Sequence, residues 1–158
     1  MLFPKHVYNF MFEALSLAER ALNEGEVPIG AVVVRNNRII GRGYNQTETL
    51  KDPTAHAEMI AITAAANSLK SKFLTGCELY ITVEPCLMCS GAILLSRIEK
   101  IYFGAFEPKF GAGGSLYNVL EENKYNHKPE VYSGIYAKES ADLMTKYFNQ
   151  KRILNNLN

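Results

Sequence analysis

Apolar side chains near the start of the chain recur at the spacing of a helix. They lie at Phe10, Leu15, Leu17, Ala18, Ala21 and Leu22. Steps of three and four positions place such side chains on one face of a helix. The polar stretch Asn23–Gly25 interrupts the pattern, and glycine is typical of a helix end. The pattern therefore predicts an amphipathic first helix that ends near residues 23–25.

The next apolar pattern is typical of β-structure. Residues 29–44 read IGAVVVRNNRIIGRGY, in which two runs rich in β-branched residues flank Asn36 and Asn37. Two such runs with two asparagines between them favour a hairpin with a two-residue turn. A polar loop from Asn45 to Thr54 follows the predicted hairpin.

Helical and strand patterns alternate along the rest of the chain. In order they predict an alanine-rich helix over 55–69, a strand over 77–83, a helix over 89–98, a strand over 100–105, a short strand over 129–135 and a helix over 138–153. This alternation predicts an α/β fold with a central sheet covered on both faces, and the hairpin makes that sheet mixed. We find no repeat or linker, so we expect a single domain over residues 1–158.

Composition and charge narrow the choice of function. The 158 residues are 47% hydrophobic and 21% charged, as in ordinary soluble proteins. The net charge of +1 means that a nucleic-acid site would have to be a local patch. The three cysteines do not form the framework of a small secreted domain, and we identify no signal peptide or membrane-spanning run. We therefore expect a cytoplasmic protein.

The cysteine pair in TVEPCLMCSGAILL stands at the head of a predicted helix. Cys86 and Cys89 are three positions apart. If a helix starts at this pair, both thiols lie on the same face of its first turn, where the helix dipole favours thiolates. Pro85 is typical of a helix start. The pair alone fits half of a zinc site, a redox pair or two small core residues.

His56 and Glu58 favour the metal site. With His56 and the two cysteines, zinc has three protein ligands and an open fourth position, which is typical of a catalytic centre. Cys77 opens a predicted strand on the far side of that strand from Cys86, and His6 and His127 lie in unrelated segments, so all three are poor fourth ligands. The residues match the pattern H-x-E…P-C-x-x-C of zinc-dependent nucleobase deaminases.

The spacing of His56 and Glu58 requires a helix start. On an ideal helix, residues i and i+2 point about 200° apart, so the two side chains share a site only near the N-terminus. Thr54, or Asp52 followed by Pro53, could provide that start. In this hypothesis zinc activates a water molecule, and Glu58 moves its proton to the ring nitrogen and then to the departing amine.

The whole chain resembles the bacterial tRNA-specific adenosine deaminases of the TadA type. The central motifs mark the wider cytidine deaminase-like superfamily, and the later segments FGAGGSL and NHKPEV are typical of the narrower family. The segments that carry the resemblance are VPIGAVVV, GRGYNQ, DPTAHAEMIAI, LYITVEPCLMCSGAILLSRI, IYFGAFEPKFGAGGSL, NHKPEV and YFNQKR. The resemblance implies a three-layer α/β/α fold with a five-stranded mixed sheet, one Zn²⁺ per subunit and a homodimer. It also implies conversion of the wobble adenosine to inosine in a tRNA anticodon loop, with a tRNA for arginine as the expected substrate.

The same resemblance assigns roles to individual residues. It makes His56, Cys86 and Cys89 the zinc ligands and Glu58 the proton shuttle. Asn45 matches the asparagine that hydrogen-bonds the flipped base, a role for which an amide has both donor and acceptor.

Three further substrate contacts are expected, from a loop and from the C-terminal helix. Glu107 lies in a loop that contacts RNA in the family, where most members carry aspartate. Phe148 and Arg152, with Tyr147 and Lys151, place aromatic rings beside positive charge, which suits unstacked nucleotides.

Other functions fit parts of the pattern. A deaminase of a free base or nucleoside, such as guanine or cytosine, would share the same zinc groups. A non-catalytic zinc-stabilised subunit that binds RNA would have no use for Glu58 beside an open position. A thiol–disulfide redox protein would form a reversible bond between Cys86 and Cys89 and bind no metal.

Overall fold

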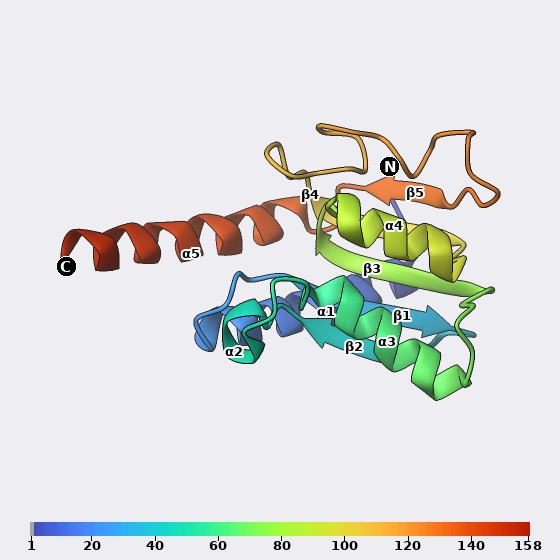
Figure 1. Ribbon diagram of the computed structural model, residues 1–158, viewed down its shortest axis with the longest axis horizontal. Helices are drawn as coiled ribbons and strands as arrows, with labels where there is room; N and C mark the ends of the chain where they lie inside the picture. The colour runs from blue at the N-terminus through green and yellow to red at the C-terminus, as the bar shows by residue number, and fades with distance from the viewer. Residues whose placement is uncertain (1) are drawn as a thin grey trace.

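The computed structural model describes residues 2–158 of the chain, which form five helices and five strands (Figure 1). The helices are α1 (Lys5–Asn23), α2 (Thr47–Leu50), α3 (Ala57–Leu69), α4 (Leu87–Ser96) and α5 (Ala137–Asn156). The strands are β1 (Gly30–Arg35), β2 (Arg38–Tyr44), β3 (Cys77–Val83), β4 (Lys100–Ala105) and β5 (Glu130–Ser133).

The five strands form one mixed sheet in the order β2-β1-β3-β4-β5. β1 is antiparallel to both of its neighbours, whereas β3, β4 and β5 are parallel. The predicted hairpin is confirmed: Asn36 and Asn37 have φ values of 49° and 59°, as a type I′ turn requires. The expected five-stranded mixed sheet is therefore present.

Helices cover both faces of the sheet and make a three-layer molecule. Alternate residues of β1 point to opposite faces, so that Val33 packs with α3 and α4 while Val32 packs with α1. α5 lies beside α1, and its C-terminal half projects beyond the sheet (Figure 1). No helix within residues 2–158 combines the length and apolar character needed to cross a membrane.

Two glycines hold α3 very close to β2. A Cβ atom at Gly43 would overlap the carbonyl oxygen of Ala57, the first residue of α3, and one at Gly41 would overlap that of Ala61. Only glycine permits this approach of helix and strand. The packing fixes the position of the first turn of α3, where His56 and Glu58 lie.

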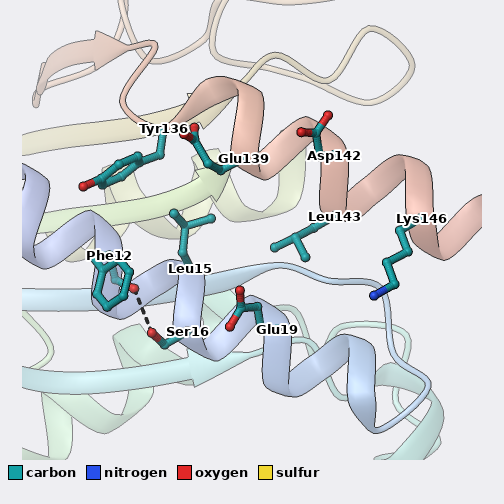
Figure 2. Close-up of a pocket in the computed structure, with 9 residues that line it drawn as sticks. All are labelled: Phe12, Leu15, Ser16, Glu19, Tyr136, Glu139, Asp142, Leu143 and Lys146. Atoms are coloured by element: carbon teal, nitrogen blue, oxygen red, sulfur yellow. Dashed lines mark hydrogen bonds between the residues drawn. The ribbon is translucent and has the colours of Figure 1, made fainter.

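A cavity of about 330 Å³ lies between α1 and α5 (Figure 2). Leu15 and Leu143 point into it from the two helices, and the carboxylates of Glu19 and Glu139 lie near its rim. It holds no cysteine or histidine, and its lining is separate from that of the larger cavity described below.

Some predicted bounds were wrong. The segment 45–54, expected to be a loop, contains the short helix α2. α4 spans Leu87–Ser96 instead of 89–98, and α5 extends to Asn156.

Candidate functional site

Two helices begin at the candidate metal ligands themselves. His56 is the N-cap of α3 and Cys86 is the N-cap of α4, and both have extended backbones, with ψ values of 153° and 175°. The expectation that Thr54 or Asp52 would start α3 was wrong. Asp52 instead accepts hydrogen bonds from the backbone N–H and the hydroxyl of Thr54, at 2.8 and 2.7 Å. Because His56 precedes the first turn, its side chain and that of Glu58 can face the same point.

The three candidate ligand atoms have the spacing of a tetrahedral zinc site. Nδ1 of His56 lies 3.6 Å from Sγ of Cys86 and 3.5 Å from Sγ of Cys89. Bonds of about 2.0–2.1 Å to nitrogen and about 2.3 Å to sulfur, at tetrahedral angles, place N and S about 3.6 Å apart. Within residues 2–158 no other group of three potential ligands lies this close together. The donor set therefore fits zinc.

The thiols share a proton when no metal is bound. A hydrogen bond from Cys89 lowers the pKa of Cys86 to about 4 and raises the pKa of Cys89. The hydrogen bond with Cys86 raises the pKa of His56. A cation that replaced the shared proton would be held by two thiolates and a neutral imidazole, which is the ionisation that zinc requires.

Glu58 lies beside this group and is buried, with 3% of its surface exposed. Its Oε2 atom has no hydrogen-bond partner in the described structure. Burial raises the pKa of Glu58 to about 7. A buried carboxyl group with a free oxygen and a pKa near neutrality is suited to proton transfer.

A cavity of about 950 Å³ brings most of the expected residues together. His56, Glu58 and Cys86 line it, and Cys89 is fully buried behind the surface. The four expected substrate contacts line the same cavity, as do Lys151 and several residues without an expected role. The expected contacts are Asn45, Glu107, Phe148 and Arg152. The residues without an expected role are Val27, Ile29, Thr47, Val83, Glu84, Lys109, Phe110, Met144 and Asn155.

Sequence analysis missed two buried carboxylates beside the cavity. Glu26 accepts hydrogen bonds from Nδ2 of Asn45 and from the backbone N–H groups of Glu48 and Thr49. It thereby fixes Asn45 and also caps α2. Glu84 binds the segment that carries Glu107. The available sequence signal was weak: each acidic residue is next to, or one residue away from, a proline in an apolar run.

Comparison with known proteins agrees with this chemistry. Residues 4–105 match the family of the cytidine and deoxycytidylate deaminase zinc-binding region. The chain is 47% identical over 150 residues to a tRNA-specific adenosine deaminase of Aquifex aeolicus, covering 94% of this chain and 96% of the relative. It is also 47% identical to the Bacillus subtilis protein of that name, covering 90% and 89% of the two chains.

Solved structures of tRNA and guanine deaminases also resemble the chain. A structure from a study of A-to-I editing by tRNA:A34 deaminases has a TM-score of 0.82 and 44% identity, over 85% of this chain and 98% of that one. A guanine deaminase of Bacillus subtilis has a TM-score of 0.61 and 41% identity, over 62% and 63% of the two chains. A guanine deaminase of Nitrosomonas europaea, with a TM-score of 0.79 and 23% identity, shares the fold. With a cytidine deaminase-like fold, a zinc-type donor set and this identity over nearly its whole length, the chain belongs to the tRNA-specific adenosine deaminases, a family of zinc-dependent enzymes.

Proposed function

We propose that the protein hydrolytically deaminates the wobble adenosine of a tRNA anticodon loop to inosine. The observation that carries this proposal is the single cavity shared by the His56–Cys86–Cys89 group, the unpaired carboxyl of Glu58 and a basic aromatic helix end. The relatives named for tRNA-specific adenosine deamination support the substrate.

His56 would hold zinc through Nδ1, and Cys86 and Cys89 through their sulfur atoms. When bound, zinc supplies Lewis acidity and lowers the pKa of a coordinated water from 15.7 towards about 7. Glu58 takes one proton from the attacking water and gives it to the ring nitrogen next to the carbon that bears the amine. A C–O bond forms at that carbon. Glu58 then takes the remaining proton from the added hydroxyl and passes it to the amine, so that the C–N bond breaks, ammonia leaves and the oxygen becomes the carbonyl oxygen of inosine.

Asn45 holds the base in this scheme. Its side chain is almost fully buried at the cavity wall, and Nδ2 is fixed by Glu26 at 3.2 Å. Nδ2 also donates to Oγ1 of Thr47 at 3.3 Å, so both of its N–H groups have partners and Oδ1 is left to accept a hydrogen bond from a purine edge. Asn45 therefore contributes to selection of the base.

The C-terminal half of α5 would contact the RNA. Phe148, Lys151 and Arg152 line the cavity from this helix, and the ring of Phe148 is half exposed. Aromatic stacking and positive charge together suit an anticodon loop whose bases are unstacked. Glu107 lines the same cavity, and we expect its carboxylate to contact a sugar hydroxyl. The patch is local, as the net charge of +1 requires.

The decisive experiment compares substrates on one enzyme preparation. We expect kcat/KM to be higher for the anticodon stem-loop of a tRNA for arginine than for free guanine, cytosine or adenosine. The rival function as a free-base deaminase is favoured by the 41% identity to the Bacillus subtilis guanine deaminase structure over 62% of the chain. Faster turnover of guanine than of the stem-loop would replace our proposal with that rival.

We propose further that the protein is a cytoplasmic homodimer that uses the outer surface of α4. Leu87 and Leu95 are 56% and 80% exposed on this helix, which is unusual for large apolar side chains. The loop that follows β4 adds exposed Phe106 and Leu116, and its Gly111 pairs with Cys86 at the start of α4. A second copy of the chain would cover this surface.

Sedimentation equilibrium tests the dimer. We expect the wild type to have twice the monomer mass at micromolar concentration and Leu95→Glu to have the monomer mass. Phe12→Glu, which changes a similarly exposed residue on the opposite face of the sheet, is the control and should leave the dimer intact. A monomeric wild type, or an unchanged mass for Leu95→Glu, would contradict this interface.

A further inference from the structure

Glu84 lies between the candidate metal site and the loop over residues 106–115. It immediately precedes Pro85 and Cys86, and only 3% of its surface is exposed. Every contact of its carboxylate that we identify is made with that one loop. An acidic side chain buried this deeply needs partners to offset the loss of water.

The two oxygens of Glu84 accept four hydrogen bonds. Oε1 accepts the backbone N–H groups of Gly113 and Ser115, at 3.0 and 2.8 Å. Oε2 accepts the backbone N–H of Glu107 at 2.8 Å and the hydroxyl of Ser115. The carboxylate therefore fixes both ends of the loop between Glu107 and Ser115.

The middle of this loop fits closely around the same carboxylate. A Cβ atom at Gly111 would overlap the carboxyl group of Glu84 and the carbonyl oxygen of Glu107. Next to it, the N–H of Ala112 binds the carbonyl oxygen of Pro85 at 2.9 Å. The loop is thus shaped around Glu84, and its Glu107, Lys109 and Phe110 line the catalytic cavity.

We propose that Glu84 is a positioning residue for the RNA substrate: it holds the 106–115 loop in the shape that aims Glu107, Lys109 and Phe110 into the cavity. This role rests on the proposed function, because these three residues lie where the anticodon loop would bind. Glu84 is part of the cavity wall, but the loop engages both of its carboxylate oxygens, so Glu84 acts through the loop. Its loss should therefore weaken substrate binding and leave the chemical step intact.

Glu84→Gln is the sharpest test. An amide group at the Oε2 position can still bond the Ser115 hydroxyl, which can turn to accept, but it opposes the N–H of Glu107. We expect KM for the stem-loop to rise about tenfold, with kcat within about twofold of wild type, because a hydrogen bond to a charged group is lost. Zinc content and dimer mass should be unchanged. Ser115→Ala, which keeps all three backbone bonds, should raise KM by less than about threefold.

A measurement without substrate separates this inference from the proposed function. In hydrogen exchange, the amides of Glu107, Gly113 and Ser115 should be protected in the wild type and exchange at least about tenfold faster in Glu84→Gln. This result is expected whichever base the enzyme deaminates. Wild-type inactivity on the stem-loop would overturn the proposed function, whereas unchanged exchange in Glu84→Gln would overturn the role of Glu84.

A second pair of variants leaves Glu84 itself unaltered. Gly111→Ala should push the loop away from the carboxylate and reproduce the exchange and KM changes of Glu84→Gln. Gly113→Ala is the matched control, because its Cβ would meet Cγ of Glu84 at 3.4 Å, an ordinary contact. A fall in kcat with unchanged KM, or equal effects of Gly111→Ala and Gly113→Ala, would contradict the proposal.

Discussion

Asn45 donates a hydrogen bond from Nδ2 to Oε2 of Glu26, over 3.2 Å in a fully buried position. The same carboxylate receives the N–H and hydroxyl of Thr49 at 2.6 and 2.8 Å. Because a carboxylate is an acceptor only, it determines which end of the Asn45 amide faces inward. The wall of the cavity therefore presents one fixed orientation of the amide.

Asn45→Asp should be destabilising in a pH-dependent manner. It places two carboxylates in contact, and we expect the free energy of unfolding to fall by about 2 kcal/mol at pH 8. The loss should shrink at pH 5, where one carboxyl group of the pair can hold a proton. Urea denaturation at the two pH values measures the effect, and an equal loss at both would contradict it. The double variant Glu26→Gln, Asn45→Asp should recover most of the stability without recovering deamination.

Glu58→Gln should retain zinc and lose activity. The amide has the shape of the carboxyl group but cannot carry protons, so we expect single-turnover deamination to fall by about 10³-fold. Metal analysis of both proteins is the control and should give one zinc per subunit. Full activity with zinc and fold retained would remove Glu58 from its proposed role.

The same substitution should make the metal-free protein more stable than the wild type, by an amount that grows as the pH rises. Burial raises the pKa of Glu58 from 4.5 to about 7 in the folded chain, so wild-type stability falls with pH between these values and levels off above them. In Glu58→Gln the amide does not titrate, so this pH dependence is absent. The difference in unfolding free energy between the two proteins should therefore be near zero at pH 4 and reach about 3 kcal/mol at pH 8. A difference that does not grow with pH would show that the site does not disfavour the charged carboxylate.

Metal removal should make one thiol reactive. Without zinc the pKa of Cys86 is about 4, so it is a thiolate at neutral pH, whereas burial raises the pKa of Cys77. We expect a chelator to allow fast labelling of Cys86 by a thiol reagent at pH 7, with Cys77 and Cys89 slow because both are buried. Added zinc should protect Cys86. A disulfide between Cys86 and Cys89 in metal-free protein purified without chelator would instead support the redox function.

Two glycine-to-alanine changes should have opposite effects. Gly43→Ala introduces a Cβ that overlaps the backbone of α3, and we expect it to cost about 2 kcal/mol and to weaken zinc binding. Gly91→Ala adds a Cβ that meets nothing within 4 Å inside α4, and alanine should stabilise that helix by up to about 1 kcal/mol. Thermal unfolding measures the stability of the two variants, and zinc titration measures their affinity for the metal. Equal stability of the two variants would argue against the close packing of α3 on β2.

Local signals explain which parts of the fold could be predicted from the sequence. Asn36 and Asn37 favour a tight turn by their own backbone preferences, so the hairpin was predicted at the correct residues. β3, which is buried along almost its whole length, was likewise predicted from its apolar run. α2 was missed because its N-terminal N–H groups are capped by Glu26, more than 20 residues away. Such a partner cannot be read from the four residues of the helix.

The candidate site also has parts that the local sequence predicts and parts that depend on distant residues. Its metal-type donors follow a compact pattern of residue types, and the structure brings all three together. The start of α3 was assigned wrongly because Asp52 and Thr54 satisfy each other in a turn, leaving His56 at the helix end. Glu84 looks like an ordinary solvated acid in the sequence, and only the returning loop reveals its partners. Its role depends on contacts over about 30 positions of chain.

The residues proposed for catalysis and those proposed for RNA binding come from different parts of the chain. The donor atoms and Glu58 come from the starts of α3 and α4, whereas Glu107, Lys109, Phe148 and Arg152 come from the β4–β5 connection and the last helix. Insertions or exchanges in those two later segments could alter which nucleic acid is accepted while the hydrolytic machinery remains untouched. Under the proposed function, rewriting the final third of the polypeptide would change which RNA is engaged, while Asn45 would keep the choice of base.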